Sequence, residues 1–160
     1  MNDLRIDLIP RTAWFSNLRS ELPRREWDLA RRKAYSLAND RCEACGGRGR
    51  KWPVEAHKQW NFDESTGVQT LTRILALCPD CHAATHYGLA EIRGQAAAAR
   101  RHLMRVNRWT EFQVDSHIHQ AFVDWHRRSL RPWTLDVRWL FDFIGCSEEL
   151  RRSLRRGTES

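Results

Sequence analysis

Two Cys-x-x-Cys pairs constrain this chain more than any other feature of its sequence. The first pair is Cys42 and Cys45, and the second pair is Cys78 and Cys81. Each pair places two thiolates on one tight turn, and two such turns can surround a single tetrahedral ion, most commonly Zn²⁺. Zinc-coupled folding supplies an apparent ~10–16 kcal/mol, which matches or exceeds the ~5–15 kcal/mol net stability of a typical domain. The sequence therefore predicts a structural zinc ion held by these four cysteines.

Two histidines follow the second cysteine pair directly. His82 and His86 are spaced i, i+4, and in a helix that spacing places both imidazoles on the same face. Imidazole is a ligand for Zn²⁺ and for several other divalent ions. We therefore expect a second ion to bind beside the structural zinc.

The overall charge of the chain indicates the class of its partner. The formal net charge is +7, the pI is about 9.7, and arginine is far more abundant than lysine. A basic chain of this kind favours polyanionic partners, with nucleic acid first; a solvated arginine-rich surface is the alternative. No apolar run reaches the ~20 residues that span a bilayer, and the polar N-terminus does not resemble a secretory signal. With paired cysteines that suit a reducing compartment, we expect a cytoplasmic protein that does not bind membranes.

Hydrophobic periodicity predicts an α+β, mostly helical fold. Leucine and isoleucine alternate with polar residues over 4–8, which favours a short strand. Thr12 is a candidate cap for a short helix that ends near residue 22, and Pro23 suits the first turn of a second helix. The elements expected next are a helix over 23–39, a strand over 52–56 that ends at His57, a loop over 60–68, a strand over 69–77, and a helix over 79–87 closed by Gly88.

The second half of the chain is predicted to be mainly helical. A helix is expected over 89–108 with a weak point at Gly94, and the capping-box pattern Thr110-x-x-Gln113 opens a helix that ends near residue 130. Alternation over 135–143 favours a strand that pairs with 4–8, with a helix as the alternative. The expected organisation is an N-terminal strand and helices in 1–40, a metal-binding core in 41–88, a helical extension in 89–146 and a disordered tail in 147–160.

Five arginines make up the strongest basic stripe in the sequence. They fall on or near the helix expected over 89–108, and no acidic residue stands between the first and the last of them. Guanidinium groups match phosphate geometry, and each phosphate contact adds salt-dependent affinity for nucleic acid. We predict nucleic-acid binding by Arg93, Arg100, Arg101, Arg105 and Arg108, with a solvated helix face as the alternative.

Residues 41–86 resemble an HNH endonuclease domain of the zinc-supported ββα-metal, treble-clef type. The resemblance covers about a third of the chain. Its most specific part is the Cys pair that runs directly into a His-x-x-x-His helix. The motifs that carry it are Cys42-x-x-Cys45, Glu55-x-His57 and Leu77-Cys78-x-x-Cys81-His82-x-x-x-His86.

This resemblance implies a catalytic ion and a reaction. In the family, the ββα unit holds a divalent ion through the helix histidines, and a histidine on the first strand activates water against a phosphodiester. Carried over, His57, His82 and His86 would bind the ion, which could be Mg²⁺, Mn²⁺, Ni²⁺ or Zn²⁺. The expected function is a metal-dependent endonuclease that acts on double-stranded DNA.

Two positions depart from the family pattern. The family usually has His-His or Asp-His where this chain has His57-Lys58, so Lys58 takes the place of the base, and the place of the family's asparagine falls on Arg73. A lysine of ordinary pKa, ~10.4, is well under 1% neutral at pH 7. In one alternative the hairpin register differs by one residue, His57 is the base, and Asp80 or Glu55 completes the metal ligands.

The sequence leaves three functions open. Besides the nuclease, the same fold could bind nucleic acid without cutting it, with Lys58 and Arg73 contacting phosphate. In the nuclease, either of these cations could instead offset charge in the transition state. The third function is a protein-interaction module that binds its partner through the Trp-rich helices.

Overall fold

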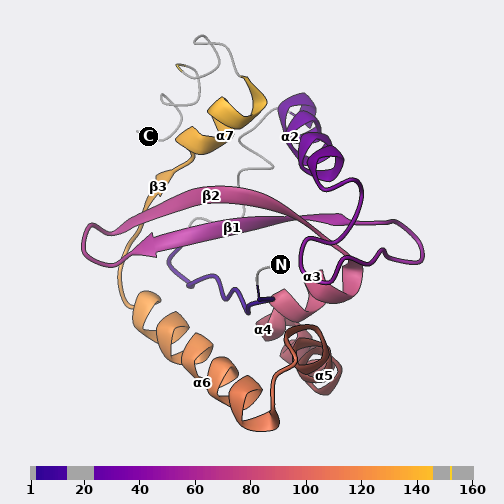
Figure 1. The fold of residues 1–160 in the computed structure, drawn as a ribbon. Coiled ribbons are helices and arrows are strands. Elements are labelled where there is room, and N and C mark those ends of the chain that lie inside the picture. The colour runs from indigo at the N-terminus through magenta and orange to yellow at the C-terminus, as the bar shows by residue number, and fades with distance from the viewer. Residues whose placement is uncertain (1–2, 14–23, 146–151, 153–160) are drawn as a thin grey trace.

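A three-stranded sheet separates two groups of helices in the computed structural model (Figure 1). The helices α2 and α7 lie on one side of this sheet, and α3, α4, α5 and α6 lie on the other (Figure 1). The structure describes residues 3–13, 24–145 and 152. This arrangement confirms the α+β class. The elements are α2 (Arg24–Leu37), β1 (Glu55–Asp63), β2 (Val68–Leu77), α3 (Pro79–Thr85), α4 (Tyr87–Ile92), α5 (Ala96–Asn107), α6 (Glu111–Arg128), β3 (Thr134–Asp136) and α7 (Arg138–Ile144).

The central hairpin is longer than the sequence predicts. β1 pairs antiparallel with β2, which confirms the strand expected over 69–77. The strand expected over 52–56 begins only at Glu55 and continues through the first four residues of the loop expected over 60–68. That loop shrinks to a turn that ends at Gly67, where φ is 72°. The register shifts between Gln59 and Trp60, where Thr72 is an extra residue on β2, as in a β-bulge.

The first described residues form an extended segment rather than the strand expected over 4–8. Leu4 and Ile6 are buried, as their alternation predicts. The segment's backbone, however, bonds to side chains and to the Thr85 carbonyl of α3, and it forms no ladder with the described sheet. The Asn107 side chain accepts from the Leu4 N–H (2.7 Å) and donates to the Leu4 carbonyl (2.8 Å), and the Ile6 N–H donates to His117 Nε2 (3.0 Å). The strand prediction is therefore wrong, although its burial pattern is correct.

The helix expected over 79–87 is divided in two. α3 ends at Thr85, His86 adopts φ −84° and ψ 50°, and α4 begins at Tyr87. Gly88 lies inside α4 and does not close a helix. The His86 N–H still donates to the His82 carbonyl (3.1 Å), so both histidines keep their helical spacing.

The remaining elements follow their local signals more closely. α2 confirms the helix expected over 23–39, and the helix expected over 89–108 breaks at Gly94 (φ 69°) into α4 and α5. Thr110 and Gln113 form the predicted capping box of α6. The stretch over 135–143 contains the end of β3 and most of α7, and β3 pairs in parallel with β2 rather than with residues 4–8.

Two hydrophobic clusters hold these layers together. The larger one joins the N-terminal segment and the cysteines to α3, α4, α5 and α6. The smaller one packs Ala30 and Ala34 of α2 against Leu71 and Ile74 of β2 and against α7. The sheet therefore has one face toward the cysteines and α3 and one face toward α2.

Two predictions fall outside the described part of the chain. The short helix expected from Thr12 to residue 22 falls largely on 14–23, and the tail over 147–160 is described only at Arg152. Among the helices that the structure does describe, none combines the length and the apolar character needed to cross a bilayer.

Candidate metal centres

The four predicted cysteines come together between two loops. Cys42 and Cys45 lie on the loop after α2, Cys78 immediately precedes α3, and Cys81 lies in its first turn. The four sulfurs lie within 4.8 Å of one another, and Cys45 Sγ is 3.7 Å from Cys78 Sγ. Tetrahedral Zn–S bonds of ~2.3 Å set neighbouring sulfurs ~3.8 Å apart. The four cysteines thus form a group of the size that holds a structural metal such as zinc.

The surroundings of the sulfurs suit a bound cation. Gly46, with φ 71°, turns the backbone so that the Gly47 N–H points at Cys45 Sγ (3.4 Å). Burial raises the pKa of Cys78 to about 11, and a hydrogen bond to Cys42 together with burial raises the pKa of Cys81. Four thiolates repel one another in this space, whereas a coordinated ion deprotonates its thiols. The donor chemistry fits a bound Zn²⁺.

A histidine that the sequence did not reveal contacts this cysteine group. His102, on α5, places its Nε2 atom 3.1 Å from Cys81 Sγ, and Arg105 Nη2 donates to its Nδ1 atom (2.8 Å). The Nδ1 atom therefore carries the lone pair, and the Nε2–H faces the sulfur. Hydrogen bonds from outer residues of this kind orient and tune metal ligands. Only the packing of α5 against α3 brings His102 here, so no local spacing marks it.

His57, His82 and His86 form the second group. One ring nitrogen from each lies within 4.8 Å of the others, and the Nε2 atoms of His82 and His86 are 3.1 Å apart. Bonds of ~2.0–2.1 Å in a tetrahedral site place two nitrogens ~3.3 Å apart. The Nδ1 atom of His57 is buried and has no hydrogen-bond partner among the described residues. A cation shared by the three rings would satisfy this nitrogen, so the group fits a divalent ion.

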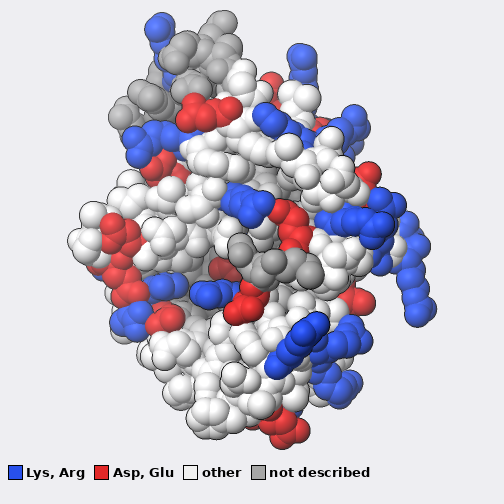
Figure 2. All heavy atoms as spheres, viewed as in Figure 1, with Lys and Arg blue, Asp and Glu red and all other residues white. Residues whose placement is uncertain are grey.

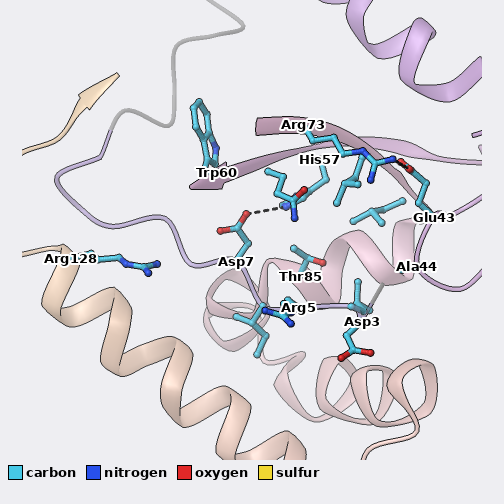
Figure 3. A pocket seen from close by; sticks show the side chains of 15 residues that line it. Asp3, Arg5, Asp7, Glu43, Ala44, His57, Trp60, Arg73, Thr85 and Arg128 are labelled. Carbon is cyan, nitrogen blue, oxygen red and sulfur yellow. Dashed lines mark hydrogen bonds and ion pairs between the residues drawn. The ribbon is translucent and has the colours of Figure 1, made fainter. Parts of the chain in front are cut away.

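Two carboxylates orient the rings of His57 and His82. Asp7 Oδ2 lies 3.2 Å from His57 Nε2, and Figure 3 shows Asp7 pointing at that ring from the N-terminal segment. Glu55 Oε2 lies 2.5 Å from His82 Nδ1. Each carboxylate holds a proton on the nitrogen it faces and leaves the other nitrogen free to bind an ion. Glu55 therefore orients a candidate ligand and is not itself a member of the histidine group. Asp80, the other carboxylate considered as a ligand, is exposed and also lies outside the group.

The electrostatics of the histidine group favour cation binding. Burial lowers the pKa of His82. Burial, with the positive charges of His57, His82 and Lys58, lowers the pKa of His86 to about 3. Neutral imidazole is the form that coordinates a metal. At neutral pH these two rings therefore need not lose a proton before they bind.

Lys58 is not part of the histidine group. Successive side chains of a strand point to opposite faces, so Lys58 faces away from His57. Its Nζ atom lies 5.4 Å from the centre of the Trp27 ring on α2. The position at which the sequence predicted a base is thus occupied by a cation that contacts the opposite layer of the fold.

Arg73 shares a cleft with His57 but is already paired. The cleft has a volume of about 920 Å³, and its lining includes Asp7, His57, Trp60 and Arg73. The Arg73 guanidinium forms an ion pair with Glu43, and the two side chains lie together in Figure 3. The second carboxylate oxygen of Glu43 accepts from the Ala76 N–H (2.7 Å). The charge of Arg73 is therefore offset within the protein.

The five arginines of the predicted stripe do not act alike. Arg100 bonds to Asp115 through two nitrogens (2.7 and 3.0 Å) and thereby ties α5 to α6. Arg105 donates to His102. Arg93, Arg101 and Arg108 are exposed, and none of them forms a salt bridge with a described residue. Of these five, Arg100 alone forms salt bridges with described residues, and Arg105 keeps its charge while one of its nitrogens bonds to His102.

Comparisons of this chain with protein-family models, curated proteins and solved structures found no match. The cysteine and histidine groups are therefore characterised by their own geometry. Both groups meet on α3, whose first turn carries Cys81 and the adjacent His82. This adjacency couples the folding of one group to the position of the other.

Proposed function

We propose that this protein is a metal-dependent endonuclease of the HNH type that hydrolyses phosphodiester bonds of DNA. The observation that carries the proposal is the group formed by His57 on β1 with His82 and His86 at α3, directly beside four cysteines. A zinc-supported hairpin followed by a histidine-bearing helix is the arrangement that the HNH resemblance implies. In this proposal the cysteines hold structural Zn²⁺ and the core is of the treble-clef type.

Few residues form the proposed site, and each of them has a distinct role. His57, His82 and His86 would hold the divalent ion, which supplies Lewis-acid stabilisation of phosphate oxygens when bound. Asp7 and Glu55 keep the rings turned and the correct nitrogens protonated. Their part is preorganisation, which lowers the cost of placing charge correctly during the reaction.

The position of Lys58 helps to identify which residue would deprotonate the attacking water. Its contact with Trp27 on the opposite face supports the alternative in which Lys58 does not deprotonate water. If His57 does not hold the ion, its unpartnered Nδ1 atom could accept a proton from water while Asp7 holds the other ring nitrogen. His57→Ala should abolish cleavage, and the ion content of that variant separates loss of a ligand from loss of a base.

Plasmid nicking by the zinc-loaded protein tests the proposal, with Mg²⁺, Mn²⁺ or Ni²⁺ added separately. His82→Ala should abolish nicking without unfolding the protein, whereas Lys58→Ala should retain most of it. His119→Ala is the matched control, because His119 is exposed on α6 and outside the group. Nicking that survives in His82→Ala would refute the proposed site.

A second candidate function is nucleic-acid binding without hydrolysis. The observations that favour it are Lys58 at the family's base position and Arg73, paired with Glu43, at the asparagine position. Salt-sensitive DNA binding without nicking under any of the ions would support this function over the nuclease. The cytoplasmic location and the protein partner of the Trp-rich helices stay predictions from the sequence.

A further inference from the structure

We propose that the loop of residues 48–53, here named the basic loop, is the surface on which the nucleic-acid backbone binds beside the histidine group. This inference rests on the proposed function, because it takes nucleic acid as the partner. It assigns the contact to a different part of the chain from the arginine stripe predicted on α4 and α5.

The basic loop is held firmly in place. The Gly49 N–H donates to the Pro53 carbonyl (2.9 Å), and Arg48 Nη2 donates to the Asn39 carbonyl (3.0 Å). A Cβ atom on Gly49 would lie 2.3 Å from the Trp52 carbonyl oxygen and 2.6 Å from Pro79 Cδ. The loop therefore packs against the first residue of α3, the helix that carries His82. A surface that is already ordered loses little conformational entropy when it binds a partner.

Hydrogen bonds connect this loop to the histidine group. The Trp52 indole Nε1–H donates to Glu55 Oε1 (2.6 Å), and the other carboxylate oxygen of Glu55 lies 2.5 Å from His82 Nδ1. Trp52 nevertheless keeps 44% of its surface exposed. An exposed residue of the loop is thus two hydrogen bonds away from a candidate metal ligand.

The exposed charge of the loop is positive and available. Arg50 and Lys51 are exposed and form no salt bridge with a described residue; Lys51 Nζ lies 5.2 Å from the centre of the Trp52 ring. Figure 2 shows Lys and Arg side chains gathered along the edge where the chain enters β1. The nearby Glu55 carboxylate uses both oxygens in the bonds described above. The loop therefore offers two exposed cations on the segment that Trp52 and Glu55 connect to His82.

The stripe on the other helices is less suited to this role. Arg100 is bonded to Asp115 and Arg105 to His102. Arg101 and Arg108 are exposed cations of the same kind as those of the loop, but in the described structure no residue next to them is hydrogen-bonded toward a histidine of the group, as Trp52 is through Glu55. They provide a matched comparison of equal charge.

The test measures binding of a fluorescent DNA duplex to the zinc-loaded full chain, at several salt concentrations and without added divalent ion. Arg50→Ala/Lys51→Ala should reduce the slope of log K against log salt by about 1.8, because each lost phosphate contact contributes ~0.9. Arg101→Ala/Arg108→Ala, which removes the same charge, should change the slope by less than half as much. Equal melting temperatures would confirm that both variants remain folded.

The results separate this inference from the proposed function. An unchanged slope in the loop variant, a larger change in the control, or no duplex binding by the unmodified protein would each overturn the inference. Loop-dependent binding without nicking would support the inference while the nuclease proposal fails. Nicking by a loop variant that binds duplex like the unmodified protein would leave the nuclease proposal standing without this surface.

Discussion

The contact between Asp7 and His57 gives the sharpest quantitative prediction. Changes to residues that orient a metal ligand typically cost 10- to 100-fold in metal affinity. Asn at position 7 keeps an oxygen that can accept from His57 Nε2, but it loses the negative charge. Because the Asp7 side chain is 21% exposed, water screens part of that charge, and we expect about a 10-fold loss for Asp7→Asn, or about 1.4 kcal/mol. Asp7→Ala leaves a buried N–H without a partner, and we expect about a 100-fold loss.

The assay is calorimetric titration of Mn²⁺ or Ni²⁺ into protein whose cysteine group already holds zinc. Asp3→Asn is the control, because Asp3 is an exposed carboxylate of the same segment and lines the same cleft. Its ion affinity should equal that of the unmodified protein. If both Asp7 variants bind the ion as tightly as the unmodified protein, Asp7 does not orient a ligand and the reasoning is refuted.

Three further predictions concern stability. Cys78→Ser should lose zinc and the cooperative thermal transition, and a folded, zinc-loaded variant would contradict the four-cysteine group. Gly49→Ala should lower the free energy of unfolding in urea by about 1–3 kcal/mol, because its Cβ meets backbone; an unchanged urea midpoint would contradict this packing. His86 has a pKa of about 3 when folded and ~6.5 when unfolded, so the unfolded chain gains the proton first as pH falls. Without added divalent ion, stability should therefore drop by about 1.4 kcal/mol between pH 7.5 and 5.5. His86→Asn should show a smaller drop, and equal drops would be the contrary result.

Local patterns in the sequence were enough to predict the parts of the site that lie close together in the chain. The cysteine pairs and the spacing of His82 and His86 depend on one or two turns of backbone. The capping box of α6 is likewise complete within four residues, Thr110 to Gln113. In each case the interacting groups lie within a few bonds of one another, so their spacing alone limits the possible geometry.

Contacts between distant segments could not be predicted in this way. Asp7 reaches His57, and His102 reaches Cys81, only because the N-terminal segment and α5 pack beside α3. The alternation over 4–8 correctly indicated which side chains are buried, but it could not indicate that Asn107, among other side chains, would replace a neighbouring strand as the hydrogen-bond partner. Period-two burial describes one buried face of an extended chain, and it does not identify what satisfies the backbone.

The number of ions bound per chain tests the central claim most directly, namely that α3 joins a structural metal group to a separate ion site. Protein loaded with one equivalent of zinc per chain is dialysed against Mn²⁺, and both metals are then counted. We predict one zinc and one manganese per chain, and one zinc with no manganese in folded His82→Ala/His86→Ala. The same manganese content in the double variant, or none in the unmodified protein, would contradict the account.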